Sequence, residues 1–380
     1  MFRFWIQTPT FVFKPGQAIM GAISDSRKRN RFCDFSLVSL LNVSDMTESD
    51  VQHICLFLQS HFIRGSSEHD VLFLFYPQHF LAYHSDPSSI CSFIRSPIEL
   101  IFDSFVSSRP IHLYFLNDSS SRTDFSISFV DFLCVRDPSD LMSLRKLLQT
   151  HFLRSCFVDS TTNDTPINCA CIFRKEDEPA LGIVPFLQFS SDVYSLQNFT
   201  RISESLPAGM RLIFLKPLLY DLQQSWCDVI LPQLNSIFKM VGVCSVDSLC
   251  ALIRARILFI GVLMEVTTGE DIVYAVYVFR DSRTVYSIAG EEGALLQLVS
   301  SVHWCDDSLF SFGFLYCLRE LLNQTKNIFQ CIMAEDIAHN SLLLPLFTGF
   351  SSHMDTHQMY YYSYNLLIPD LQGSSCFFLF

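Results

Sequence analysis

Residues 129–135 read FVDFLCV, and they are followed by Arg136, Asp137 and Pro138 and by a helix-like segment over residues 139–154. Such an apolar run is typical of a buried strand, and the Asp-Pro turn ends it abruptly. A strand that stops at a helix N-terminus can bind an anion, because the first N–H groups of the helix point at the ligand. The same pattern occurs in many α/β proteins, so the rest of the chain decides its meaning.

The composition predicts a globular protein with a large core. The chain has 380 residues, of which 49% are hydrophobic and 17% are charged, and this fits two domains or one large double domain. Its 38 acidic residues outnumber its 26 lysines and arginines, which gives a formal net charge of -12. A nucleic-acid-binding surface needs a basic face to contact phosphates, so we expect no nucleic acid partner.

The sequence gives no sign of export or of membrane insertion. Residues 1–20 lack the continuous apolar run of a signal peptide. The longest interior apolar run, residues 257–264, is far shorter than the ~20 residues that a transmembrane helix requires. We therefore expect a soluble chain with no transmembrane segment.

The cysteines indicate a reducing compartment. The chain has 14 of them, mostly in apolar contexts, which fits core thiols better than a disulfide framework. Cys169 and Cys171 are one residue apart, but no second pair stands at the spacing of zinc ligands, so no metal site is predicted. We therefore expect a cytoplasmic protein.

The first half of the chain predicts an antiparallel sheet with helices packed on it. Thr47 and Asp50 form a capping pattern at the start of an amphipathic helix. A short helix is predicted over residues 77–83, and the helix after Pro138 has leucines at helical spacing. Strands are predicted over residues 70–76, 98–106, 111–117, 125–135, 169–174 and 181–189, with polar turns at 107–110 and 118–124.

A polar stretch with a Pro/Gly break at residues 201–209 is the candidate boundary between two domains, over residues 1–203 and 204–380. Beyond this break the chain alternates helices and strands as before, so the two halves look architecturally alike. We predict helices over residues 225–240 and 307–324, and strands over 257–266, 272–280, 328–334 and 360–367.

Three landmarks occur in an order that resembles one enzyme family. Phe4 and Trp5 precede a Gln-Thr-Pro stretch, residues 131–135 read DFLCV, and residues 361–366 read YYSYNL. Glycylpeptide N-myristoyltransferases have a Phe-Trp pair before Thr, Gln and Pro, then an NFLCV strand, and near their end a YYLYNW-type strand. The chain is identified as a strongly diverged member of that family, because the joint order of the motifs matches over nearly the whole sequence.

The resemblance implies an α+β fold. Two tandem acetyltransferase-like (GNAT) halves would form a continuous curved, mostly antiparallel sheet flanked by helices. Residues 1–203 would bind acyl-CoA, and residues 204–380 would complete a groove for the peptide. The implied activity is transfer of a myristoyl group from myristoyl-CoA to the N-terminal glycine amine of proteins, by direct attack of the amine. Myristoyl-CoA would be a co-substrate, and no other cofactor is implied.

The resemblance also assigns the catalytic groups. The backbone N–H groups of Phe132 and Leu133 would hold the thioester oxygen, and backbone donors tolerate changes of sequence. The base would be the terminal carboxylate of Phe380. The tail at residues 376–380, CFFLF, is apolar to its last residue, and burial would raise the pKa of that carboxylate and improve it as a base. Without the resemblance, a tail that merely caps the core is the simpler interpretation.

Further site residues follow from the resemblance. The expected acyl-CoA-binding residues are Phe4, Trp5, Cys134, Val135, Arg136, Ser139 and Arg145. The expected peptide-binding residues are Glu68, Asp70, Tyr76, Asp131, Arg174 and Tyr277.

The sequence departs from the family at binding positions. The family has a loop rich in Lys and Arg after its signature, which grips the phosphates of CoA, whereas this chain has Asp137 and Asp140 there. The helix dipole and the N–H groups near Ser139 remain as anion donors. Two alternatives therefore stay open, namely a pseudoenzyme that binds acyl-CoA or peptide without catalysis, and a related acyltransferase that uses a shorter acyl group.

Overall fold

The structure is a computed structural model. The structure describes residues 21–22, 33–62, 71–96, 102–116, 122–137, 140–155, 170–176, 184–196, 199, 205–266, 271–288, 291–350 and 352–380.

One large sheet organises the molecule. Among the described residues it contains 15 strands, and its main path runs β17-β10-β5-β6-β7-β15-β8-β14-β13-β12-β11-β9. A separate pair joins β1 to β16. The strands are β1 (Gly21–Ala22), β2 (Ser39–Asn42), β3 (Val71–Phe73), β4 (Ile90–Arg95), β5 (Phe102–Leu116), β6 (Arg122–Val135), β7 (Cys171–Glu176), β8 (Leu187–Ser195), β9 (Met210–Phe214), β10 (Met240–Val243), β11 (Leu258–Glu265), β12 (Ile272–Ile288), β13 (Glu291–His303), β14 (Phe329–Glu335), β15 (His353–Tyr364), β16 (Leu366–Leu367) and β17 (Cys376–Leu379).

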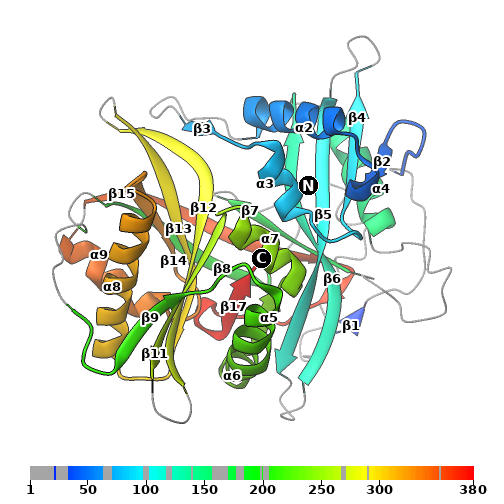
Figure 1. The fold of residues 1–380 in the computed structure, drawn as a ribbon. Helices are drawn as coiled ribbons and strands as arrows, with labels where there is room; N and C mark the ends of the chain where they lie inside the picture. Colours follow the sequence, from blue (N-terminus) through cyan, green and yellow to red (C-terminus); the bar gives the residue numbers. More distant parts are fainter. Residues whose placement is uncertain are drawn as a thin grey trace.

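The predicted fold class is confirmed. Most strand pairs are antiparallel, and the parallel pairs among the described strands are β6–β7, β10–β17 and β13–β14. Figure 1 shows the sheet as a continuous twisted surface, with helices α2, α3 and α4 around β4 to β6 and with α8 and α9 beside β13 to β15. This is an α+β arrangement.

The two halves of the sequence exchange strands. β8, from the first half, lies between β14 and β15, which both come from the second half. β10 and β17, from the second half, extend the sheet next to β5. The largest core cluster accordingly joins residues as distant as Ile54, Phe105 and Phe378. The division at residues 203 and 204 stays a prediction about sequence, because the sheet itself runs through both halves.

The helices cover the sheet with their apolar faces. In α2, Thr47 and Asp50 form the predicted capping box, and Val51, Ile54 and Leu58 are buried. In α4, Leu147, Leu148 and Phe152 pack in a cluster with β4, β5, β6 and β7. The helices are α2 (Glu48–His61), α3 (Pro77–Tyr83), α4 (Leu141–Ser155), α5 (Leu219–Leu222), the π-helix η3 (Gln223–Ile230), α6 (Leu231–Ile237), α7 (Val246–Arg254), α8 (Asp307–Gln324) and α9 (Leu344–Phe350), with short 3-10 turns η1 (Val43–Asp45), η4 (Asn340–Leu342) and η5 (Gly373–Ser375).

The turn predicted at residues 107–110 is wrong, because β5 runs through it. Ser107, Ser108 and Arg109 are buried in the middle of that strand. Pro110 is tolerated there for a geometric reason. On one side of β5, β4 pairs as far as Ser108 and β10 pairs only from His112, so the proline falls between these two partners.

The predicted helix over residues 225–240 is also displaced. The helical stretch runs from Leu219 to Ile237, changes to π geometry in η3, and ends before β10 begins at Met240. Leu222, Trp226, Ile230 and Leu234 recur every four residues and are buried. They belong to the core cluster that also contains β10 and β17.

Candidate functional site

The motif at residues 131–135 contains a β-bulge in β6. Asp131 pairs with Ser107 of β5 and Cys134 pairs with Phe105, so Phe132 and Leu133 together stand opposite the single residue Val106. Phe132 has a φ of 46°, a left-handed conformation that is unusual for a bulky residue. A bulge disrupts the ladder locally and releases N–H groups for a ligand. The sequence motif therefore encodes a distortion of the strand.

Aromatic packing holds Phe132 in this strained conformation. Its ring centroid lies 4.8 Å from that of Phe75, 5.4 Å from that of Tyr83 and 5.5 Å from that of Phe62. Strain of this kind persists only when the surrounding structure over-determines it. The next side chain, Leu133, is 40% exposed, so the bulge lies where the sheet meets solvent.

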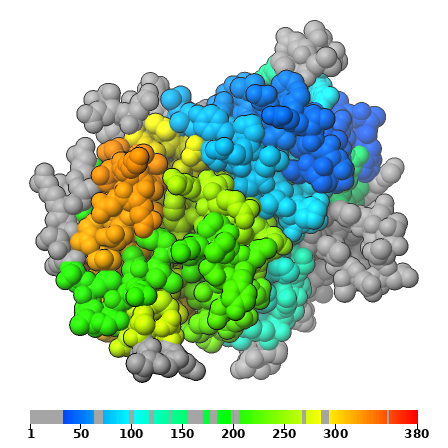
Figure 2. Space-filling view, viewed as in Figure 1, coloured from blue at the N-terminus to red at the C-terminus, as the bar shows by residue number. Residues whose placement is uncertain are grey.

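The tail of the chain is buried, as its apolar sequence predicts. β17 pairs in parallel with β10, and Phe380, immediately after it, is 6% exposed. Gly242 of β10 makes room for it, because a Cβ at that position would lie 2.6 Å from Cε1 of Phe380. The face of the molecule shown in Figure 2 carries no red segment. The residues of β17 are buried.

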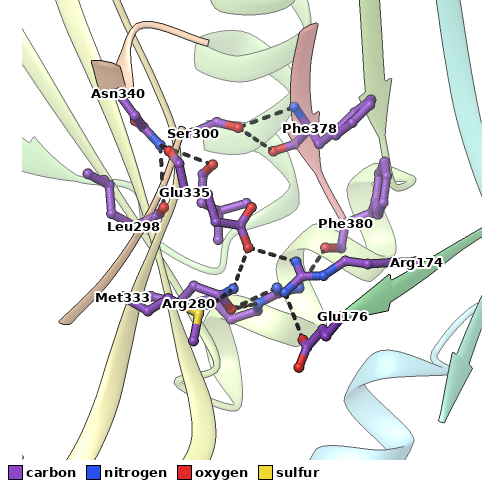
Figure 3. A network of polar contacts seen from close by, with 12 residues as sticks. Arg174, Glu176, Arg280, Leu298, Ser300, Met333, Glu335, Asn340, Phe378 and Phe380 are labelled. Carbon is purple, nitrogen blue, oxygen red and sulfur yellow. Dashed lines mark hydrogen bonds and ion pairs between the residues drawn. The ribbon is translucent and has the colours of Figure 1, made fainter. Parts of the chain in front are cut away.

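An arginine contacts the main-chain oxygen of Phe380. Nη1 of Arg280 in β12 donates to that oxygen at 3.1 Å, while its Nε and Nη2 donate to Oε1 of Gln297 at 3.0 and 2.8 Å. Gln297 donates in turn to the buried carboxylate of Glu335, and this carboxylate pairs with Arg174 at 2.7 Å. Figure 3 shows the network as a chain of contacts that ends at Phe380. Charged side chains of β7, β12 and β14 therefore fix the position of the last residue.

The tail lies close to the bulge. The ring of Phe129 in β6 is 4.4 Å from the ring of Phe380, centroid to centroid. Phe129 precedes Phe132 by three residues, which is about 10 Å along an extended strand. Phe132, Leu133 and Phe380 are thus brought into one region by the consecutive strands β17, β10, β5 and β6.

The N-terminus of α4 is occupied by a side chain of its own loop. Oδ1 of Asp140 accepts a hydrogen bond from the N–H of Ser143 at 3.0 Å. Hydrogen bonds from the hydroxyl and the N–H of Ser143 lower the pKa of Asp140. A capping carboxylate satisfies the donors that an anion would use, so Asp140 competes with a phosphate at this helix end.

The expected phosphate-binding cations have protein partners. Nη2 of Arg136 donates to the carbonyl of Phe102 at 3.1 Å, and Nη1 of Arg145 lies 4.0 Å from the sulfur of Met142 on the first turns of α4. Lys146 pairs with Asp34 at 2.9 Å. Arg136 lies before the N-terminus of α4, and Arg145 lies within α4. Cys134 and Val135 continue the strand beyond the bulge as partners of Phe105 and Ser104.

The expected peptide-binding residues that the structure describes have different surroundings. Tyr76 is exposed at the start of α3, and the guanidinium of Arg283 lies 5.9 Å from its ring. Arg174 is tied to Glu335 inside the network described above. Asp131 pairs with Arg109 at 2.7 Å.

Tyr277 was expected in the groove, and the structure does not place it there. It is 0% exposed in the core of the second half, and its hydroxyl donates to the carbonyl of Phe310 at 2.7 Å. A side chain closed off in this way does not line a groove, so we leave Tyr277 out of the candidate site. Phe4, Trp5, Glu68, Asp70 and Ser139 lie outside the described residues.

Sequence reasoning missed three residues of this region. Arg280, Arg109 and Gly242 lie inside ordinary strands, and no local motif marks them. A charged residue within an apolar run is the signal that could have found Arg280. The other two depend on contacts between strands that are far apart in sequence.

Within the part of the chain that the structure describes, no group of three or more His, Cys, Asp or Glu side chains is arranged to hold a metal ion. In the same residues, no helix combines the length and the apolar character needed to cross a membrane.

Solved structures of other proteins share this fold. No family model matches the sequence, and no curated protein matches it by sequence. Two solved structures of N-myristoyltransferase from Saccharomyces cerevisiae with bound myristoyl-CoA are similar, with TM-scores of 0.67 and 0.69 and 12% identity, covering 98% of this chain and 89% and 94% of theirs. A third, which also holds inhibitors, has a TM-score of 0.69 with 12% identity and covers 98% of this chain and 91% of that one.

The chain therefore has the fold of N-myristoyltransferase over nearly its whole length. At 12% identity the likeness concerns the fold, and the activity has to be argued from the site.

Proposed function

We propose that this protein is an acyltransferase that takes an acyl group from acyl-CoA. The observation that supports this best is the bulge at Phe132 and Leu133, because a φ of 46° at a phenylalanine is a costly conformation with a geometric purpose. Two successive N–H groups released from a ladder are suited to stabilise the oxyanion that forms when an amine attacks a thioester.

The reaction needs no covalent intermediate on the protein. The amine nitrogen forms a bond to the thioester carbon, the C–S bond breaks, and CoA leaves as a thiolate that finally takes up the proton that the amine loses. The proton of the amine passes to the carboxylate of Phe380. An N-terminal amine has an unperturbed pKa of about 7.7–8.0, so a modest base is sufficient.

Arg280 has two opposing effects on such a base. Its guanidinium favours the ionised carboxylate and fixes its position, but the same charge makes the carboxylate a weaker acceptor for a proton. Burial of Phe380 acts in the other direction. The mechanism also requires that the mature protein ends at Phe380, which an intact mass measurement checks.

The finer assignment follows the family resemblance. We propose myristoyl-CoA as the donor and the N-terminal glycine of a protein as the acceptor, with a cytoplasmic monomer as the active form. The Phe-rich interior favours a long acyl chain, because each buried methylene contributes about 0.8 kcal/mol.

The direct test is product formation. The protein is incubated with myristoyl-CoA and a peptide that begins with glycine, and the peptide mass is measured. We expect a mass increase of one acyl group. The same peptide with an acetylated N-terminus is the control, and it should stay unmodified. Butyryl-CoA and decanoyl-CoA in parallel reactions determine the acyl length. Binding of every donor without any product would contradict acyl transfer.

One observation favours a second candidate function, that of a non-catalytic binding protein. Such a protein would keep the fold but bind CoA weakly. Asp140 caps α4 where a phosphate would be held. Asp140→Ser keeps a neutral cap and removes the charge, so acyl-CoA should bind about 2–5-fold more tightly if the phosphates lie there. Asp247→Ser, at the exposed first turn of α7, is the matched control. If no acyl-CoA raises the melting temperature of either the wild type or Asp140→Ser, the binding function is excluded as well.

A further inference from the structure

A buried arginine lies in the middle of the sheet beside the bulge. Arg109 of β5 is 2% exposed, although arginine is rarely buried so completely. Its Nε donates to Oδ2 of Asp131 at 2.7 Å. Asp131 immediately precedes Phe132, and 12% of its side chain is exposed. The ion pair is therefore partly accessible to solvent next to the bulge.

The two Nη atoms of the guanidinium differ from its Nε. Nη1 and Nη2 of Arg109 are both buried and make no hydrogen bond to any described residue. The rings of Tyr83 and Phe129 lie 5.3 and 5.7 Å from its Cζ and pack on the guanidinium. Buried charged donors left without an acceptor are costly, and proteins normally satisfy them. The two Nη atoms are therefore an unexplained feature of a region that is otherwise well packed.

The position of Arg109 links it to the candidate site. Arg109 is the strand partner of Phe129, whose ring contacts that of Phe380. Tyr83, the other ring beside the guanidinium, packs edge-to-face on Phe132 at 5.4 Å. Arg109 is thus next to the bulge on one side and next to the tail on the other.

A nearby histidine does not supply the missing acceptor. His84 lies in the same cluster, with its ring 5.9 Å from that of Phe132, and its Nε2 is also buried without a partner among the described residues. Nδ1 of His84 lies 3.0 Å from the carbonyl of Phe80 and so donates to it, which leaves Nε2 with a lone pair. This lone pair can accept a hydrogen bond from a ligand, whereas the cation that packs on Tyr83 beside the bulge is Arg109.

We propose that Nη1 and Nη2 of Arg109 form a subsite for a carboxylate of the ligand, beside the bulge at Phe132. A carboxylate presents two oxygens that match two guanidinium N–H groups in parallel, and arginine forms this paired contact better than lysine does. The inference rests on the proposed acyl transfer for the identity of the ligand. The carboxylate comes either from the far end of the acyl group or from an acidic residue that follows the acceptor glycine.

Asp131 modulates this subsite. Its carboxylate holds Nε of Arg109 and also repels a second anion. Removal of the Asp131 charge therefore has different effects if the ion pair is purely structural and if Arg109 is part of a ligand subsite. If the pair is only structural, Asp131→Asn weakens the fold and changes no ligand preference. If Arg109 binds a carboxylate, the same change tightens that ligand in particular.

The test compares ligands that differ in one carboxylate. In the donor arm, succinyl-CoA is compared with butyryl-CoA, and the N-acetylcysteamine thioesters of both acids repeat the comparison without CoA. In the acceptor arm, peptides that begin Gly-Asp are compared with those that begin Gly-Asn. Affinities are measured by calorimetry with the wild type, Arg109→Gln, Asp131→Asn and the control Arg319→Gln on α8.

We expect the wild type and Arg319→Gln to prefer the carboxylated ligand by about tenfold in one arm, and that arm identifies the source of the carboxylate. Arg109→Gln should remove the preference, and Asp131→Asn should increase it. If Arg109→Gln is too unstable to measure, the double variant with Asp131→Asn, which removes both charges, replaces it. Equal affinities in both arms, or a preference that survives loss of Arg109, would overturn the proposal.

The outcomes also separate this inference from the proposed function. Acyl transfer without any carboxylate preference leaves the function and rejects the subsite. An Arg109-dependent preference among N-acetylcysteamine thioesters or peptides, with no transfer from any CoA donor, leaves the subsite and rejects the function. If no ligand of either arm binds, the subsite is rejected.

Discussion

At the scale of single residues, Arg280 has the most specific role. It joins the main-chain oxygen of Phe380 to Gln297, and through Gln297 to the buried carboxylate of Glu335. The side-chain amide of Gln297 fixes one side of the planar guanidinium of Arg280. The other side can therefore bind a carboxylate with little further loss of side-chain conformational entropy. We interpret Arg280 as a positioning residue for the proposed base.

Arg280→Gln should lower the rate of acyl transfer by about 10–100-fold with little change in the KM for acyl-CoA, because it removes a contact to the base and not to the donor. Arg280→Lys keeps the charge but loses the planar arrangement of several N–H donors, so it should recover part of the rate. Arg211→Gln, at the exposed edge strand β9, is the control. A rise in KM with an unchanged kcat would contradict this role.

Buried histidines make stability depend on pH. Burial lowers the pKa of His84 to about 4, below its ordinary value of 6.5. Between these pH values the unfolded chain binds a proton that the folded chain does not. The free energy of unfolding therefore falls as the pH falls from about 6.5 to about 4, and it is fully retained above 6.5.

His84→Asn keeps a hydrogen-bond donor for the carbonyl of Phe80 and removes the imidazole that takes up a proton. Its free energy of unfolding, measured with urea, should fall less between pH 7 and pH 5 than that of the wild type, by roughly 1–2 kcal/mol. His53→Asn, on the exposed face of α2, should behave like the wild type. An identical pH slope in His84→Asn and the wild type would show that His84 does not contribute.

At the scale of elements, β6 combines a regular strand with one irregular step. Phe132 and Leu133 stand opposite Val106, and the pairing on both sides of this step is regular. Removing one of the two residues would restore alternation without shifting the strand on either side. The bulge can therefore be deleted while the rest of the sheet keeps its register.

Deletion of Leu133 should keep the fold and reduce acyl transfer by about 100-fold or more, the usual effect of losing an oxyanion-hole donor. Leu133→Ala keeps both N–H groups and the bulge, and because the side chain is exposed it should change the rate little. Circular dichroism and melting temperature report the fold of both variants. Equal transfer rates for the two would mean that the bulge has no catalytic role.

The elements also show what sequence patterns can and cannot determine. The helices at 77–83 and 307–324 match α3 and α8, because a proline at N1 and an Asp306 cap mark their ends locally. Residues 107–110 look like a turn, but they lie inside β5, because two other strands leave a gap opposite Pro110. The pairing of neighbouring strands overrides a local turn signal.

At the scale of the whole molecule, the candidate site is assembled from both halves. The bulge comes from β6 in the first half, and Phe380 follows β17 at the end of the second. β10 pairs with both β17 and β5, and β5 pairs with β6, so four consecutive strands of the sheet connect the two parts. The apolar tail predicts burial, but only this strand order brings it to the bulge.

Some residues of the candidate site could be predicted from the sequence, and others could not. Phe132, Leu133 and Phe380 could be proposed from short motifs, since a backbone distortion and a chain end need few specific side chains. Arg109 and Arg280 could not, because their partners Asp131 and Gln297 are brought near by strand pairing. The placement of Tyr277 in a core shows the limit of assigning a groove from a sequence resemblance.

The central claim is that a carboxylate at Phe380 and the bulge at Phe132 act together in acyl transfer. The most direct measurement is the single-turnover rate of transfer to a glycine peptide, at saturating acyl-CoA, for the wild type and for a protein with one glycine added after Phe380. The added residue moves the carboxylate by about 3.8 Å and leaves the bulge in place. We predict a rate about 100-fold lower with an unchanged Kd for acyl-CoA. An unchanged rate would contradict the account.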